Sequence, residues 1–189
     1  MIYVLTGIAK SGKTKVAREI VKRKSIPLFS TDYIMMMLSK GNKDLDIDID
    51  ASDSSVAKDL EPYIYGMIST MIENKVDYLL EGVHFNPDFS RRLIEKYPND
   101  IRIVYLGYKD KNFKDKAKEL LLYKNEIENP WFLSFKGEKL FELMEYMVNE
   151  SQRVYELCIQ FDLEYIEVRN IVDQMDEIMK TLFDKKLRF

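Results

Sequence analysis

Short runs of β-branched and aromatic residues alternate along this chain with longer segments of helical periodicity. We predict five strands, at Ile2–Thr6, Pro27–Ser30, Asp77–Glu81, Ile101–Leu106 and Glu164–Val168. Such alternation is typical of a parallel sheet whose strands are joined by crossover helices. The hydrophobic pattern therefore predicts an α/β fold.

The segments between these strands have the apolar spacing of amphipathic helices. We predict helices at Lys13–Lys24, Asp32–Ser39, Ser55–Asn74 and Pro87–Lys96. The clearest period lies in Gly137–Phe161, with a stripe at Leu140, Met144, Met147, Ser151, Val154, Cys158 and Phe161. The last helix repeats the spacing at Ile171, Met175, Ile178 and Leu182. We attribute both stripes to core packing rather than to a cofactor site.

One segment, Gly41–Ser55, has no helical period and is rich in aspartate. We predict a mobile acidic loop there. No internal repeat and no low-complexity linker divides the chain. Its 189 residues, 46% of them hydrophobic, are enough for one well-packed core. We therefore expect a single domain over residues 1–189.

Charge and cysteine content narrow the possible partners and compartments. The 29 basic and 32 acidic residues are mixed along the chain, so no cationic stripe is present and nucleic acid is not an expected partner. Cys158 has no second cysteine to pair with, and Thr6 and Gly7 interrupt the first apolar run. No run approaches the roughly 18 apolar residues of a membrane span. We expect a soluble, cytoplasmic protein of undetermined oligomeric state.

The motif GIAKSGKT, Gly7–Thr14, matches G-x-x-x-x-G-K-[ST] between the first strand and the first helix. Gly7 and Gly12 permit a phosphate-binding loop (P-loop) whose N–H groups surround phosphate oxygens. Lys13 is expected to reach the β- and γ-phosphates, and the Thr14 hydroxyl to bind Mg²⁺. A glycine-rich turn without a ligand is the alternative, which the strand-to-helix context disfavours. The predicted nucleotide-binding residues here are Gly7, Lys10, Ser11, Gly12, Lys13 and Thr14.

Two carboxylates follow other predicted strands. Asp32, in STDYI, lies where it can accept a proton from a hydroxyl that attacks the γ-phosphate. The alternative is that Asp32 only caps the helix, a role that Ser30 or Thr31 can also fill. Glu81 ends a buried strand, where an acid can orient Mg²⁺ or its water shell.

Four further features admit a functional and a structural interpretation. His84, the only histidine, cannot form a zinc site alone and either contacts substrate or packs internally. Arg91 and Arg92 either clamp an anionic substrate or belong to a solvated helix face. Trp131 either packs a hinge or forms an aromatic wall for a substrate. The NKVD sequence at 74–77 matches a guanine-binding motif, but its place before a middle strand indicates coincidence.

Together, GIAKSGKT, STDYI and LLEGVHF resemble the nucleoside-monophosphate-kinase-like branch of P-loop kinases. The last two motifs resemble 2-phosphoglycerate kinase, whose broad group includes zeta toxins and chloramphenicol phosphotransferase. The resemblance implies a three-layer α/β/α fold with a five-stranded parallel sheet in the order 2-3-1-4-5. It also implies ATP with Mg²⁺ as the donor and Asp32 as the base toward a small-molecule acceptor.

The same resemblance implies a helical lid after the fourth strand, at about residues 107–135. Such lids bring arginines onto the transferred phosphate, but residues 107–128 of this chain contain no arginine. They contain Lys109, Lys111, Lys114, Lys116, Lys118 and Lys124. Arg153 resembles the arginine that faces the phosphates in adenylate-kinase-like enzymes, although an ordinary surface role is equally open. Arg169 lies where family members hold the adenine.

The sequence thus predicts an ATP-dependent phosphotransferase that acts on a hydroxyl or phosphate of a small molecule. An ATP-binding regulatory module and an NTPase without an acceptor are the alternatives. The proposed catalytic residues are Asp32, Lys13 and Arg153, and the proposed acceptor contacts are Asp32, His84, Arg91 and Arg92. No motif identifies the acceptor.

Overall fold

The computed structural model describes residues 1–42, 44–45, 47–127 and 129–184. Lys43 and Asp46 of the predicted acidic loop and Glu128 of the predicted lid lie outside these ranges. The elements follow in the order β1 (Ile2–Gly7), α1 (Lys13–Lys24), β2 (Leu28–Ser30), α2 (Thr31–Gly41), α3 (Asp53–Glu73), β3 (Tyr78–Glu81), α4 (Pro87–Lys96), β4 (Ile101–Gly107), α5 (Phe113–Leu122), a 3₁₀ helix (Trp131–Ser134), α6 (Glu138–Gln160), β5 (Glu164–Glu167) and α7 (Met175–Phe183).

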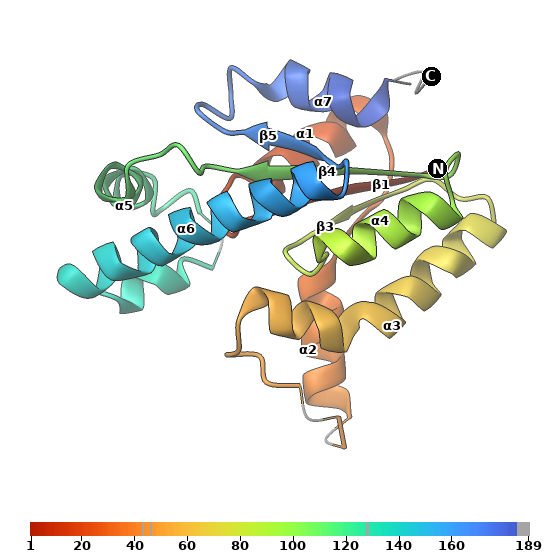
Figure 1. Cartoon of the computed structure of the whole chain (residues 1–189), viewed down its shortest axis with the longest axis horizontal. Coiled ribbons are helices and arrows are strands. Elements are labelled where there is room, and N and C mark those ends of the chain that lie inside the picture. The colour runs from red at the N-terminus through yellow and green to blue at the C-terminus, as the bar shows by residue number, and fades with distance from the viewer. Residues whose placement is uncertain (43, 46, 128, 185–189) are drawn as a thin grey trace.

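The five strands form one parallel sheet in the order β2-β3-β1-β4-β5, which confirms the predicted fold (Figure 1). The register pairs Leu5 with Glu81, Ser30 with Glu81, and Gly7 with Leu106. Because the strands are parallel, the carboxyl ends of β1, β2 and β3 meet at one edge. The P-loop and Asp32 come directly after β1 and β2 at this edge, and Glu81 is the last residue of β3.

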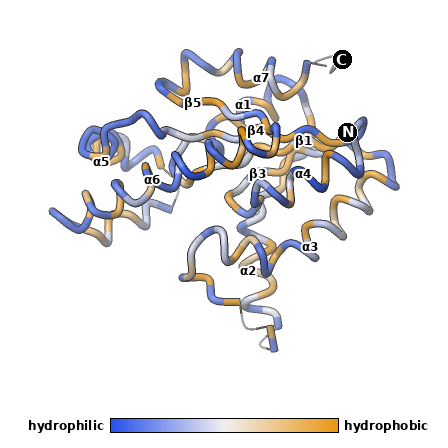
Figure 2. The backbone as a smooth tube through the Cα atoms, viewed as in Figure 1, coloured by the Kyte–Doolittle hydropathy of each residue, from blue (hydrophilic) through white to orange (hydrophobic). Residues whose placement is uncertain are grey.

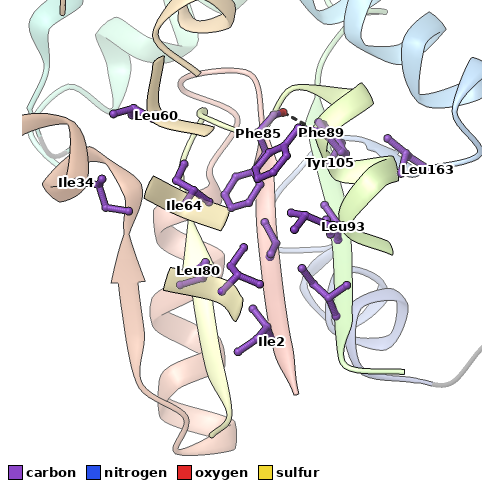
Figure 3. Packing of buried hydrophobic residues seen from close by; sticks show 14 of the residues in the cluster. Ile2, Ile34, Leu60, Ile64, Leu80, Phe85, Phe89, Leu93, Tyr105 and Leu163 are labelled. Atoms are coloured by element: carbon purple, nitrogen blue, oxygen red, sulfur yellow. Dashed lines mark hydrogen bonds between the residues drawn. The ribbon is translucent and has the colours of Figure 1, made fainter. Parts of the chain in front are cut away.

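Alternate residues of each strand face opposite sides of the sheet, and helices cover both sides. Ile2 and Val4 of β1 belong to a core with α3 and α4. Figure 3 shows Leu93 of α4 directed toward the strands. Leu5 belongs to the opposite core, with α1 and α7. Hydrophobic and hydrophilic residues alternate along these helices, as expected for helices with one side on the sheet and the other in solvent (Figure 2).

A third core lies beyond the sheet, between α5, the 3₁₀ helix and the first half of α6. Phe132 and Met144 are fully buried in it. Buried Tyr108 ties this core to the P-loop, because its hydroxyl donates to the Ala9 carbonyl over 2.8 Å. In Figure 1, α5 and the start of α6 extend away from the other helices. Within the described ranges, no helix combines the length and apolarity needed to span a bilayer.

The predicted acidic loop is shorter in the structure than Gly41–Ser55. Helix α2 continues through Gly41, and α3 begins at Asp53 instead of Ser55. The side chain of Ser52 caps α3 by accepting a hydrogen bond from the Ser55 N–H. Asp53, which the sequence assigned to the acidic loop, is therefore the first residue of a capped helix.

The apolar stripe predicted for residues 137–161 lies on a helix along almost its whole length, whereas the C-terminal stripe does so only in part. On α6 the stripe faces the core as predicted, with Ser151 and Cys158 fully buried and its last member, Phe161, at the helix end. At the C-terminus, α7 begins only at Met175, so Ile171 does not belong to that helix. Ile171 packs in the same core from the preceding turn. Its apolar spacing reflects burial rather than helical structure.

We expect Gly7→Ala to lower the free energy of unfolding by about 3 kcal/mol or more. Gly7 has φ of 113°, and a Cβ there lies 2.1 Å from the Leu106 carbonyl oxygen on the neighbouring strand. Gly66→Ala is the matched control, because Gly66 lies inside α3 with no atom within 4 Å of the added Cβ. That variant should gain about 0.5–1 kcal/mol. Urea unfolding measures both, and equal stability of the two variants would contradict the argument.

Candidate active site

The P-loop leaves the first turn of α1 open to an anion. Gly12 is the N-cap of α1 with φ of 92°, and no side chain caps the helix. No acidic residue lies in the first turn either. The first N–H groups of a helix lack intrahelical partners and form the positive end of its dipole. This helix start is therefore suited to phosphate oxygens.

Lys13 is a buried cation inside this loop. Its ammonium donates to the Ile8 carbonyl over 2.7 Å and lies 3.5 Å from the Ser11 hydroxyl. Burial lowers the pKa of Lys13 to about 8, although the charges of Glu81, Asp53 and Asp32 oppose the shift. Because burial destabilises the charged form of Lys13, an anionic ligand beside its ammonium would stabilise that form strongly.

Thr14 and Glu81 lie together at the mouth of the P-loop. The Thr14 hydroxyl donates to Glu81 Oε2 over 3.4 Å, and Glu81 is buried at the end of β3. A hydroxyl and a carboxylate are hard oxygen ligands of the kind Mg²⁺ prefers, with water completing the shell. The donor set therefore fits the ion that the sequence predicts.

Asp32 lies in the first turn of α2, with an exposed side chain. Ser30 caps α2, since its hydroxyl accepts from the Asp32 N–H, so the Asp32 carboxylate is not needed as the cap. The charge of Asp32 acts on Lys10 and Lys13 of the P-loop. An exposed acid without a capping role thus lies within electrostatic reach of two P-loop lysines.

Buried His84 connects Asp32 to the turn after β3. Its Nδ1 lies 2.8 Å from the Thr31 hydroxyl and 3.7 Å from Asp32 Oδ1. Gly82 makes this approach possible, because a Cβ there would lie 1.9 Å from the Thr31 hydroxyl oxygen. The structure therefore places His84 as an internal neighbour of Asp32, while any contact with an acceptor stays a prediction.

We expect acid to destabilise the protein through His84. Burial lowers the pKa of His84 below its ordinary 6.5, although the Asp32 charge raises it. Below pH 6.5 the unfolded chain therefore binds more protons, and stability is lost as pH falls. Between pH 7 and 5, the wild type should lose up to about 1.4 kcal/mol per pH unit more than His84→Gln. Urea unfolding at several pH values measures this, and parallel pH profiles of the two proteins would contradict it.

A pocket of about 360 Å³ opens beside the P-loop, and we name it the P-loop pocket. Its walls are Gly7–Ala9, Val83 and Phe85–Pro87 of the turn after β3, the segment Asp50–Ser54, Trp131 and the face of α6 between Leu143 and Val154. Tyr105 also reaches it from β4. The pocket has the size of a small-molecule site and adjoins the loop suited to phosphate.

Arg153 lines the P-loop pocket from α6, as the predicted phosphate contact requires. Its guanidinium is paired with Glu150 one turn earlier, with Nη2 2.8 Å from Glu150 Oε2. Because the pair is partly exposed, its net stabilisation is small and the arginine can exchange partners at little cost.

Lys10 links the P-loop to the segment after α5. Its ammonium donates to the Asn129 carbonyl over 2.9 Å and lies 5.6 Å from the ring centre of Trp131 and 5.8 Å from that of Phe132. Burial lowers the pKa of Lys10, against the charge of Asp32. Lys10 thus joins the predicted lid region to the P-loop, as the Tyr108 hydroxyl does through Ala9.

The turn containing Arg169 also lies near the P-loop. A Cβ on Gly12 would lie 2.9 Å from the side chain of Ile171, so this turn packs directly on the start of α1. The N–H groups of Arg169 and Asn170 donate to the Gln174 side chain, which fixes the turn. Arg169 itself is exposed, and its contact with adenine stays a prediction.

The structure does not bring Arg91 and Arg92 to the P-loop pocket. Arg91 contacts the Phe161 carbonyl just before β5 begins, at the opposite edge of the sheet from the P-loop. Arg92 forms a two-nitrogen pair with Glu61 of α3 at 2.7 and 2.8 Å. These pairs match the solvated-face interpretation, and we leave both arginines out of the proposed acceptor site.

Sequence analysis named none of the three acids of the pocket, Asp50, Asp53 and Glu150, as a site residue. Asp50 and Asp53 were assigned to an acidic loop, and Glu150 lies on a long helix where an acid is unremarkable in sequence. The available signal was the helix period, since Glu150 lies one turn before Arg153 on the same face. Which face meets the P-loop depended on the packing of α6.

No model of a known protein family matches this sequence, and none of the curated proteins matches it. Several solved structures have the same fold at low identity. A shikimate kinase from Bacteroides thetaiotaomicron has a TM-score of 0.57 and 14% identity, covering 98% of this chain and 99% of its own. A shikimate kinase from Acinetobacter baumannii, in complex with shikimate, has a TM-score of 0.54 and 14% identity over 99% and 94%.

A gluconokinase from Sinorhizobium meliloti 1021 also has a TM-score of 0.54 and 14% identity, covering 96% of this chain and 88% of its own. Sequence identities this low establish the fold alone. The chain therefore has the fold of P-loop kinases that act on small molecules.

Proposed function

We propose that this chain is an ATP-dependent phosphotransferase that moves the γ-phosphate to a small-molecule acceptor. The observation that supports it best is the position of Asp32, an exposed acid free of capping and within electrostatic reach of Lys10 and Lys13. A purely regulatory module has no need of such an acid beside the P-loop. The fold shared with small-molecule kinases supports the same conclusion.

In the proposed reaction, Gly7, Gly12 and Lys13 bind the triphosphate through N–H groups and one buried ammonium. Thr14 and Glu81 would hold Mg²⁺, which supplies neutralisation of phosphate charge. Asp32 accepts the proton of the attacking hydroxyl. Catalysis at such a site consists mainly of positioning and charge stabilisation.

The resemblance to the 2-phosphoglycerate kinase, zeta toxin and chloramphenicol phosphotransferase group supports the assignment of Asp32 and of a lid at residues 107–135. We propose that Arg153 exchanges Glu150 for the transferred phosphate, because the described part of the lid offers lysines but no arginine. An arginine in this role is worth about 10³-fold or more in rate. We likewise propose that Arg169 contacts the base of the nucleotide.

An assay of ADP release tests the function. Purified protein with ATP and Mg²⁺ is assayed alone and against a panel of hydroxyl compounds, and products are identified by mass spectrometry. A kinase shows slow ADP release alone and faster release, with a phosphorylated product, for some members. ADP release indifferent to every compound would indicate an NTPase, and tight ATP binding without turnover would indicate a regulatory module.

A further inference from the structure

Carboxylates predominate in the wall of the P-loop pocket. Asp50, Asp53 and Glu150 line it, against Arg153 as the one cation among its described lining residues. Arg153 does not compensate all three, because its Nε and Nη2 both donate to Glu150, over 2.8 to 3.1 Å. The pocket beside the P-loop is therefore electrically negative before any ligand enters.

Asp50 and Asp53 are exposed residues of this wall, and neither side chain pairs with a described residue. Asp53 is the first residue of α3, but Ser52 already caps that helix. No hydrogen bond or ion pair from a described residue reaches its side chain. Desolvation by its surroundings raises the pKa of Asp53; the charge of Lys13 opposes the shift, and those of Asp32 and Glu150 reinforce it. A cation beside Asp53 would relieve the repulsion among these acids.

The pocket volume of about 360 Å³ suits a small organic molecule. Tyr146 and Trp131 share the wall, and aromatic rings are favourable neighbours of organic cations.

We propose that the phosphate acceptor of this site is an amine-bearing alcohol, whose ammonium group binds Asp53 and Glu150 while its hydroxyl faces Asp32. The inference rests on the proposed kinase function. An anionic acceptor would be repelled by the three carboxylates, and a neutral polyol would gain no charge attraction from them. Arg153 and Lys13 remain available to the phosphates.

The transfer balances with these residues. The hydroxyl oxygen forms a bond to the γ-phosphorus, and the bond from that phosphorus to the bridging oxygen breaks with its electron pair leaving on ADP. The hydroxyl proton goes to Asp32. The ammonium group takes no part in bond making and serves to orient the acceptor.

Two matched sets of probes test the charge preference. One set is D-glucosamine, D-glucose and D-glucuronate, and the other is 2-amino-1,3-propanediol, glycerol and glycerate. Calorimetry with Mg²⁺ and a non-hydrolysable ATP analogue should show at least about tenfold tighter binding of the amine than of the neutral compound in at least one set. The acid should bind more weakly than both. No preference for the amine in either set would overturn the inference.

Asp53→Asn should abolish that preference. Asp59→Asn is the matched control, the same substitution at an exposed position of α3 outside the pocket, and it should keep the preference. An undiminished preference in Asp53→Asn would overturn the assignment. ADP release stimulated only by neutral or anionic probes would overturn the inference and leave the kinase function standing. Amine preference without ADP release for any probe would overturn the kinase function instead.

Discussion

Asp32→Asn should reduce acceptor phosphorylation by about 10²- to 10⁴-fold, the usual contribution of a general base. The amide preserves the shape of the side chain but cannot take the proton of the attacking hydroxyl. Helix α2 should stay intact, because its cap is the hydroxyl of Ser30. Nucleotide affinity should stay near that of the wild type, since Asp32 acts on Lys13 only as the third of three opposing carboxylates.

The measurement is the rate of product formation with an acceptor found in the ADP-release screen, paired with calorimetry of ATP binding. Asp44→Asn is a suitable control, as an exposed acid of the segment after α2. Retained phosphorylation in Asp32→Asn would remove Asp32 as the base. Loss of both ATP binding and phosphorylation would assign it a structural role instead.

Lys13→Met is expected to weaken ATP binding by about 10²-fold or more, because truncating one member of a buried charge pair is costly. The same change should leave the ligand-free protein at least as stable as the wild type. Burial already lowers the pKa of Lys13 to about 8, so the fold holds this charge at a cost. Methionine keeps the apolar stem, and the Ile8 carbonyl still accepts from the Ser11 N–H.

Thermal unfolding with and without ATP and Mg²⁺ measures both effects in one experiment. The wild type should be stabilised by the nucleotide, whereas Lys13→Met should not respond. Lys15→Met, exposed two residues further on, should behave as the wild type. A variant that still responds fully to ATP would show that Lys13 does not bind the phosphates.

The fold was largely predictable from local sequence. Strand positions follow from short β-branched runs, and the P-loop connects the first of them to a helix with a recognisable spacing. Element ends were less predictable, because the start of α3 depends on capping by Ser52, whose neighbours are loop-forming aspartates. Ile171 had the apolar spacing of the helix but lies in the turn before α7. A buried residue in a turn and a buried residue in a helix give the same apolar position in the sequence.

The candidate site likewise contains residues that the sequence placed and residues that only packing placed. Motif spacing placed the P-loop, Asp32 and Glu81, and the parallel sheet brought them to one edge. Sequence favoured Arg91 and Arg92 as acceptor contacts, but α4 turns them toward Glu61 and toward the start of β5.

What the sequence determined by itself is the P-loop, because its residues are neighbours in the chain and their spacing alone sets its geometry. The P-loop pocket, the proposed acceptor site, was decided by tertiary structure. Asp53 and Glu150 are almost a hundred residues apart, and they meet only because α3 and α6 both pack beside the P-loop. The electrostatic potential of a site depends on charges from distant segments, and packing decides which charges lie there. No local sequence pattern predicts that potential.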